Sequence, residues 1–237
     1  MRTAHRLTAT AALACAAALG LTGCFASGPF ADLSGSEVAD KSVDALRGAA
    51  SLTVSGKIWD EGKPMELNMA VSKTGDCRGT IASEEGSFEL IRNAEFVFIK
   101  ADEPFYRSQM KDLPKDQADG AVKQLAGHWL KSKASDADSK EIASLCDLDE
   151  LLKEFDDSKG AKKGEVTSVS GQKALTLTTK TDEGTETLLV ATEGTPYLLK
   201  AGITGKEPAE VSFSGFDEPV QAEAPADKDV IDPDQLG

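Results

Sequence analysis

The stretch PMELNMAVS, residues 64–72, alternates apolar side chains with polar or small ones. Its apolar positions are Met65, Leu67, Met69 and Val71. Successive side chains of a β-strand point to opposite faces of the sheet, so this alternation predicts a strand with one buried face. We therefore expect Met65, Leu67 and Met69 to lie on the apolar side of a β-sheet.

The alternation continues on both sides of this stretch. Residues 52–58 repeat it, and the turn sequences DEG, TGD, EEG and RN follow one another between residues 60 and 93. A second series of short alternating segments runs from near residue 164 to residue 216. Short strands separated by regular turns are typical of an antiparallel meander. The two series predict about ten strands, and an open twisted sheet of that size tends to curl.

Helical spacing interrupts the strand pattern in two places. Residues 36–50 carry apolar side chains at helical intervals, and an insert at about 102–159 does so between Ala118 and Trp129. Asp147 begins a further helix in this insert, because its carboxylate can cap the first turn. These amphipathic helices need an apolar surface to cover. The sequence thus predicts an α+β fold, a curved antiparallel half-barrel sheet of about ten strands with helices covering the concave face.

The N-terminus has the features of a bacterial lipoprotein signal peptide. Residues 1–23 begin with a positive charge and continue as an apolar run too short to span a bilayer. The residues that resemble a lipobox, the motif for lipidation and cleavage, are Leu21, Thr22, Gly23 and Cys24. We expect Cys24 to receive a diacylglyceryl group with acyl chains such as palmitate, and to become the first mature residue. The alternative is an ordinary signal peptide with a chance cysteine.

Beyond the signal peptide, the chain divides into a short tether and one domain. Residues 24–35 are rich in small side chains and would reach about 35 Å at most when extended. Residues 36–237 form the domain, which ends in an acidic tail at about 218–237. The formal charge of −14 becomes −16 when Arg2 and Arg6 leave with the signal peptide. A chain with this much negative charge repels nucleic acid, and we therefore exclude nucleic acid as a partner.

Three cysteines lie beyond the predicted signal peptide, and two of them, Cys77 and Cys146, remain besides the predicted lipidation site. In an oxidising, extracytoplasmic compartment such a pair favours a disulfide. Closing a loop of about 70 residues stabilises a fold by up to about 4 kcal/mol. The alternative is a pair of buried free thiols.

Catalytic residues are scarce. His128 is the only histidine outside the signal peptide, and no nucleophile motif or set of metal ligands accompanies it. We interpret His128 as a surface or helix-capping residue. The sequence therefore predicts no enzyme activity, no cofactor and no metal site.

Four stretches carry a resemblance to a known family. They are ELIRNAEFVFIK (89–100), HWLKS (128–132), GTPYLLK (194–200) and SFSGFDEPVQAEAPADKDVID (212–232). Together with the lipobox and the order of elements, they resemble the LppX/LprAFG group of actinobacterial lipoproteins, within the LolA/LolB-like lipoprotein-carrier superfamily. The resemblance implies a half-open antiparallel barrel with helices across its concave side. It also implies a cavity that takes acyl chains in several members.

The functional hypothesis is a membrane-anchored extracytoplasmic lipoprotein that binds or shuttles a lipid or other amphiphile in an apolar cavity. The candidate wall residues are Met65, Leu67, Met69, Phe96, Phe98, Leu175, Leu177 and Phe213 from the sheet, and Trp129 from the helical insert. The alternative is a non-carrier surface module whose packed barrel binds a protein partner or supports the cell envelope. Composition does not decide between a cavity and a packed core.

Overall fold

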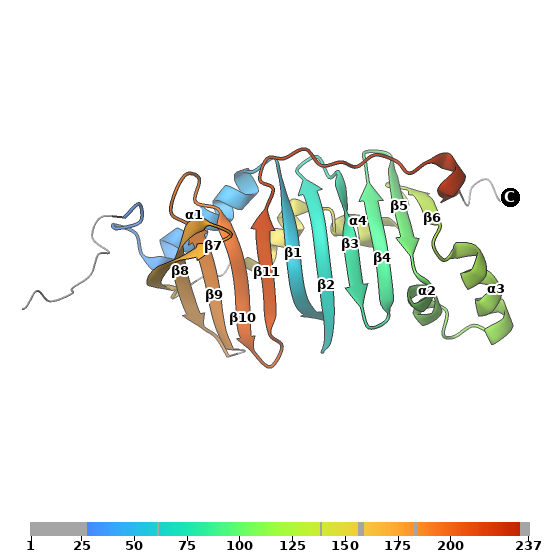
Figure 1. Cartoon of the computed structure of the whole chain (residues 1–237), viewed down its shortest axis with the longest axis horizontal. Helices are drawn as coiled ribbons and strands as arrows, with labels where there is room; N and C mark the ends of the chain where they lie inside the picture. The colour runs from blue at the N-terminus through green and yellow to red at the C-terminus, as the bar shows by residue number, and fades with distance from the viewer. Residues whose placement is uncertain (1–27, 61, 138, 156–158, 183, 233–237) are drawn as a thin grey trace, which may run out of the picture.

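The computed structural model describes residues 28–60, 62–137, 139–155, 159–182 and 184–232. The predicted signal peptide and Cys24 lie outside the described residues. Within them the chain forms an open, curved antiparallel sheet of twelve strands with five α-helices (Figure 1). The predicted α+β class is confirmed, with two strands more than the sequence indicated.

The strands are β1 (Ser51–Asp60), β2 (Lys63–Ser72), β3 (Cys77–Ser83), β4 (Gly86–Arg92), β5 (Phe96–Ala101), β6 (Trp129–Lys133), β7 (Lys162–Val169), β8 (Gln172–Lys180), β9 (Gly184–Ala191), β10 (Leu198–Gly205), β11 (Ala209–Ser214) and β12 (Val230–Ile231). The helices are α1 (Gly35–Gly48), α2 (Glu103–Gln109), α3 (Lys115–Leu125), α4 (Ser139–Ser144) and α5 (Leu148–Leu152). Two short 3₁₀ turns, η1 (Lys153–Phe155) and η2 (Asp227–Asp229), complete the described structure.

The two predicted meanders join into one sheet at β1, which pairs with β2 on one side and β11 on the other. The spatial order is β12-β6-β5-β4-β3-β2-β1-β11-β10-β9-β8-β7. The described strands pair antiparallel throughout, except that the short β12 runs parallel to β6. The first strand of the first meander, β1, and the last strand of the second meander, β11, therefore pair in the middle of the sheet rather than lying at its edges.

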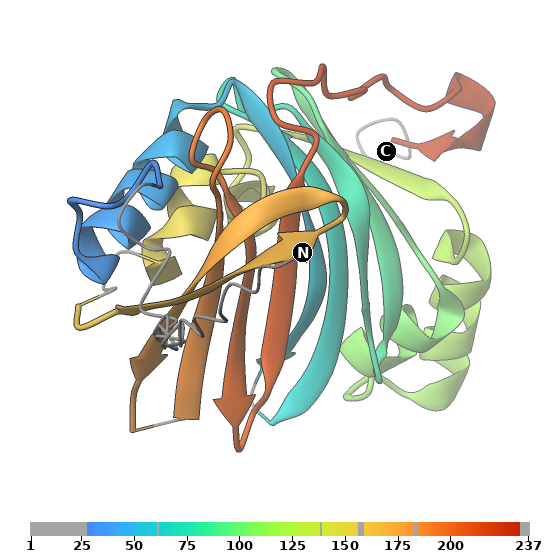
Figure 2. The ribbon, with the colours of Figure 1, turned by 60° about the vertical axis from the view of Figure 1, so that its left-hand side comes forward.

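The strand register sorts the side chains onto two faces. Val54 lies opposite both Met69 and Phe213, so these three share one face, which we call the helix-bearing face. Ser55, the next residue of β1, lies opposite Asn68 and belongs to the other face, which we call the open face. Figure 2 shows α1 and the helices that follow β6 together on one side of the sheet.

Helix α1 covers part of the helix-bearing face. The Ser34 hydroxyl accepts a hydrogen bond from the Glu37 N–H at 3.2 Å, and the Glu37 carboxylate accepts one from the Ser34 N–H at 2.7 Å. This capping box satisfies two N–H groups at the start of the helix. Val38 and Leu46, on the inner side of the helix, are fully buried. The predicted N-terminal helix is confirmed to within two residues at each end.

A packed core fills the space between this helix layer and the sheet. Its largest fully buried side chains include Leu46, Leu52, Leu90, Leu152, Leu177, Leu188 and Leu198. At the β6 end of the sheet, α2 and α3 pack on the same face, against Phe88, Ala101 and Leu130. The helices of the insert therefore cover the sheet as the sequence predicted.

The insert also contains a strand that the sequence analysis missed. Trp129 was expected at the end of a helix, but α3 ends at Leu125 and Gly127 turns the chain with a φ of 78°. Trp129 then begins β6, where Leu130 lies opposite Ile99. The helical spacing from Ala118 was right as far as Leu125, and the positive-φ glycine ended it. His128 lies exposed in this turn.

The acidic tail opens with Val220 and Ala222, two apolar residues at strand spacing. The structure places no strand there; the strand of the tail is β12, where Val230 pairs with Trp129. Figure 1 shows the tail running along one end of the strands before it reaches β6. Ala222 and Val230 both contact a small apolar cluster on the open face. Burial of that cluster, rather than strand pairing near residue 220, positions the tail.

The structure joins Cys77 and Cys146 in a disulfide, as the cysteine count favoured. Their Cα atoms are 5.4 Å apart, and neither side chain is exposed. Cys77 begins β3, while Cys146 precedes α5, whose first turn is capped by the Asp147 carboxylate. The bond therefore ties the α4 and α5 segment to the sheet.

A second polar tie lies at Asp102, which starts α2. Its carboxylate accepts hydrogen bonds from the Phe105 N–H at 2.9 Å, and from the Ser87 N–H and hydroxyl at 3.0 and 2.8 Å. Although burial raises the pKa of Asp102, these hydrogen bonds outweigh it and hold the pKa below its ordinary value. One carboxylate thus joins the start of α2 to the start of β4.

We expect Asp102→Asn to lower the free energy of unfolding by about 1 to 2 kcal/mol near pH 7, because the amide group cannot accept all three hydrogen bonds. A lowered pKa contributes stability above the unfolded-state value of about 3.9, and this contribution is lost as the pH falls through the folded-state pKa. Urea unfolding should therefore separate the variant from the parent at about pH 7 and bring them together near pH 2. Exposed Asp112 supplies the control, and Asp112→Asn should match the parent at both pH values.

Candidate functional site

The helix-bearing face is not uniformly buried. Five half-buried apolar residues, which we call the apolar patch, lie on its central strands: Ile58, Met65, Leu67, Ile203 and Val211. Ile58 lies opposite Met65, and Gly56 lies opposite both Leu67 and Val211, so the patch is continuous across β2, β1 and β11. Figure 1 shows α1 behind β8 to β10 and α4 behind β3, with α2 farther along the sheet.

The apolar patch is an extension of the core. Met65, Leu67 and Val211 pack against the main core cluster. At the margin the Phe155 ring meets the Phe213 ring edge-on, with centroids 5.5 Å apart. An apolar group seated on the patch would meet carbon atoms on the sheet side without displacing the packed interior, and each Å² removed from water contributes about 25 cal/mol.

The patch accounts for two of the nine predicted wall residues, Met65 and Leu67. Four others, Met69, Leu175, Leu177 and Phe213, lie on the same face but inside the packed core, where none is more than 4% exposed. They therefore support the sheet beneath the patch in this structure.

The remaining three, Phe96, Phe98 and Trp129, lie on the open face, and grouping them with the others was wrong. Phe96 and Phe98 alternate with Val97, which is the residue of β5 that joins the main core. Phe98 and Trp129 instead form the cluster that the C-terminal tail covers. β5 is therefore apolar on both faces because one face packs against the main core and the other packs against the tail.

An ion pair also attaches the C-terminal tail to the cluster of Ile91, Phe98 and Trp129. The Lys131 ammonium lies 3.0 Å from the Asp232 carboxylate and 4.1 Å from the centre of the Phe96 ring. Both partners of the ion pair are largely buried, so solvent screens them less than an exposed pair. The three aromatic residues thus hold the tail rather than form a ligand wall.

The sequence analysis did not predict three members of the apolar patch as site residues: Ile58, Ile203 and Val211. Ile58 and Val211 belong to recognised alternating segments, so their inward direction was available from the sequence. That these residues lie side by side was not available from the sequence. Gly56 of β1 lies opposite Leu67 on β2 and Val211 on β11, and β11 is far from β1 in the chain.

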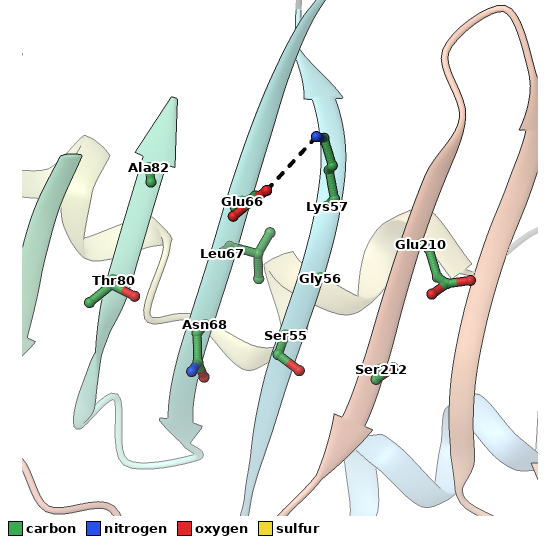
Figure 3. A pocket seen from close by; sticks show the side chains of 10 residues that line it. All are labelled: Ser55, Gly56, Lys57, Glu66, Leu67, Asn68, Thr80, Ala82, Glu210 and Ser212. Atoms are coloured by element: carbon green, nitrogen blue, oxygen red, sulfur yellow. Dashed lines mark ion pairs between the residues drawn. The ribbon is translucent and has the colours of Figure 1, made fainter. Parts of the chain in front are cut away.

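A shallow groove of about 420 Å³ crosses the open face (Figure 3). Its polar side chains include Ser55, Asn68 and Ser212, from β1, β2 and β11. Lys57 and Glu66 lie 3.8 Å apart on its wall, so opposite charges offset each other there. The groove thus offers hydrogen-bonding groups from three strands, on the opposite side of these strands from the apolar patch.

Among the described residues, no three of His, Cys, Asp and Glu are placed to hold a metal ion. Burial raises the pKa of Tyr106, which is the buried residue of α2, lies among apolar neighbours and is therefore a neutral phenol at physiological pH. The described helices are too short or too polar for any one of them to cross a membrane. The chemistry available on the patch is apolar contact.

The fold and the patch together define a class of protein: an open, curved antiparallel sheet whose helix-bearing face is covered by helices only in part and is apolar where they do not cover it. No protein-family model and no curated protein matches the sequence. Among solved structures the chain is similar to the Mycobacterium tuberculosis lipoprotein LppX, with 15% identity and a TM-score of 0.49 over 79% of this chain and 97% of that one.

Two further similarities involve MucB. A chain of the Pseudomonas aeruginosa MucA/MucB complex is 16% identical, with a TM-score of 0.33 over 86% of this chain and 60% of that one. A crystal structure of MucB is also 16% identical, with a TM-score of 0.32 over 82% and 61%. The chain thus spans about three fifths of both MucB-related chains. At these identities the similarities concern the fold alone.

Proposed function

We propose that this protein is a membrane-anchored extracytoplasmic lipoprotein that binds or shuttles a lipid or other amphiphile, with the acyl chains held against the apolar patch. Lipidation of Cys24, predicted from the lipobox, would provide the anchor. The protein has no part in covalent chemistry under this proposal; its role is to remove acyl chains from water.

One observation carries the proposal: apolar side chains on the helix-bearing face continue out of the core into a partly exposed patch instead of ending beneath a helix. Transfer of an acyl chain from water to such a surface contributes about 0.8 kcal/mol for each buried CH₂. Because the core beneath is packed, the ligand would lie along the sheet between α5 and α2 rather than deep inside it.

Native mass spectrometry of the mature domain, purified without detergent, tests the proposal directly. We expect a bound lipid or fatty acid that leaves the protein on collisional activation. A ligand-free protein that also fails to bind phosphatidylcholine with a pyrene-labelled acyl chain would contradict it.

Substitution in the patch should weaken this binding. We expect Leu67→Gln to reduce affinity for the pyrene-labelled lipid by about tenfold, because loss of apolar contact worth about 1.4 kcal/mol corresponds to that factor. Its neighbours Glu66 and Asn68 point to the open face of the same strand, so Glu66→Gln and Asn68→Ala serve as matched controls with unchanged affinity. Equal weakening by the control variants would place the lipid elsewhere.

A second candidate function is a module that binds a protein partner. The observation that favours it is the closed core, in which Met69, Leu175 and Phe213 are buried. In that case the polar groove or the apolar patch would contact protein instead of lipid. Absence of lipid in the mass spectrum, together with protection of either surface from hydrogen exchange in the native envelope, would support this candidate.

A further inference from the structure

The tether predicted at residues 24–35 is already folded from its fifth residue onward. The Ala31 N–H donates to the Gly28 carbonyl at 3.0 Å, and the Leu33 N–H donates to the Phe30 carbonyl at 3.2 Å. The side chains of Phe30 and Leu33 pack against the main core. The tether is therefore much shorter than its sequence suggested, because its second half belongs to the domain.

A lysine of the edge strand holds this folded part in place. The Lys163 ammonium, on β7, donates to the carbonyl oxygens of Leu33 at 2.6 Å, Phe30 at 2.9 Å and Ala31 at 3.4 Å. Hydrogen bonds from a charged donor are about twice as strong as those between neutral groups. The start of the described chain is thus attached to the β7 end of the sheet.

The start of α1 reinforces this attachment. A Cβ atom at Gly35 would overlap the Ala161 carbonyl, so the backbones of α1 and the segment entering β7 are in direct contact. The Gly160 N–H also donates to the Ser36 hydroxyl at 3.1 Å. Figure 1 places the first described residues at the same end of the sheet as β8 and α1.

The length of chain between the anchor and this attachment sets how the domain meets the membrane. Only residues 25–27 separate Cys24 from Gly28, and four residue steps span about 14 Å at most. The sheet has twelve strands, so its other edge lies about 50 Å away along the sheet. A lipid anchor at Cys24 therefore brings the β7 end, and not the β6 end, to the bilayer.

We propose that β7, the adjoining residues 28–34 and the start of α1 form the surface that faces the lipid bilayer. This inference rests on the lipid anchor of the proposed function. Val166 on β7 is an apolar side chain that is 52% exposed at this end. In the described part of the chain the sheet ends at β7, whereas β12 and the tail cover β6 at the opposite end. The polar headgroup region can satisfy the backbone groups of such an open edge.

The net charge of the whole chain does not draw the protein to the membrane. The mature chain is strongly acidic and repels anionic headgroups. The orientation depends instead on the short anchor and on the Lys163 hydrogen bonds, so it should change when those bonds are removed.

Photocrosslinking at two matched positions tests the orientation. Leu113, between α2 and α3, is 48% exposed and lies near the β6 end, so it matches Val166 in exposure but not in place. The lipidated full chain, carrying a benzophenone amino acid at position 166 or 113, is reconstituted into phosphatidylcholine vesicles and illuminated. We expect phospholipid adducts several-fold more often at position 166. Lys163→Ala should reduce this preference, and Lys163→Arg, which keeps a charged donor, should retain most of it.

Equal adduct yields at the two positions, or a preference for position 113, would overturn the orientation. The mass of the N-terminal peptide is measured first, because absence of acyl chains on Cys24 would contradict the anchor and not the orientation. In that case Cys24 of the signal-free chain is coupled to a maleimide phospholipid in the vesicle, and the same two positions are compared.

Discussion

Loss of the Cys77–Cys146 disulfide is expected to lower the free energy of unfolding by about 4 kcal/mol, which is a large share of the 5 to 15 kcal/mol typical of a domain. The bond spans 69 residues of sequence, so it removes much of the freedom of the unfolded chain. It also attaches the segment between α4 and α5 to β3. We expect guanidinium unfolding of the Cys77→Ala/Cys146→Ala double variant to show a correspondingly lower midpoint.

The control for this experiment is Cys24→Ser in the signal-free chain, which removes a thiol that the disulfide does not use. Its unfolding midpoint should equal that of the parent. A double variant within about 1 kcal/mol of the parent would show that the loop between the two cysteines is already restricted in the unfolded state.

Truncation of Phe213 is the second large effect. Phe213 is 4% exposed, lies opposite Val54 on β1 and meets the Phe155 ring edge-on. Removing a buried phenyl ring costs both its burial and the cavity left behind, so we expect Phe213→Ala to lower the free energy of unfolding by about 3 to 5 kcal/mol. Urea unfolding followed by tryptophan fluorescence measures the loss.

Ser212, the preceding residue of β11, points to the open face and provides the matched control. Ser212→Ala should change stability by no more than about 0.5 kcal/mol. A loss below about 1 kcal/mol for Phe213→Ala would indicate that the ring borders an open space rather than packed atoms. The result therefore decides whether an acyl chain can enter the core or is limited to the apolar patch.

The patch and the core lead to opposite expectations for neighbouring residues. Leu67→Gln should weaken lipid binding strongly and stability less, because the side chain is already partly exposed. Phe213→Ala should weaken stability strongly. Comparing the two variants separates a ligand surface from the structure that supports it.

Much of the fold was predictable because it depends on local patterns. The alternation around Met65 to Val71 predicted β2, the turn residues predicted the meanders, and Asp147 predicted the cap of α5. The disulfide followed from the number of cysteines left after the lipobox. Trp129 was misplaced because the helical spacing continued by chance beyond Gly127, whose positive φ ended the helix.

The candidate site was only partly predictable. Met65 and Leu67 were expected on an apolar face, and both lie in the apolar patch. Phe96 and Phe98 looked equally suitable, because a run of apolar residues does not say which face meets which neighbour. The acidic tail, more than a hundred residues later in the chain, decided this by covering them.

The sequence by itself determined most strands of the two meanders, the cap of α5 and the charge, and it predicts the lipid anchor, because each depends on residues close together in the chain. Tertiary structure alone decided that β1 pairs with β11, that the tail occupies the open face, and that the tether folds onto Lys163. These choices join residues more than a hundred positions apart. They depend on which apolar surfaces pack against each other, and short-range periodicity carries no information about that partner.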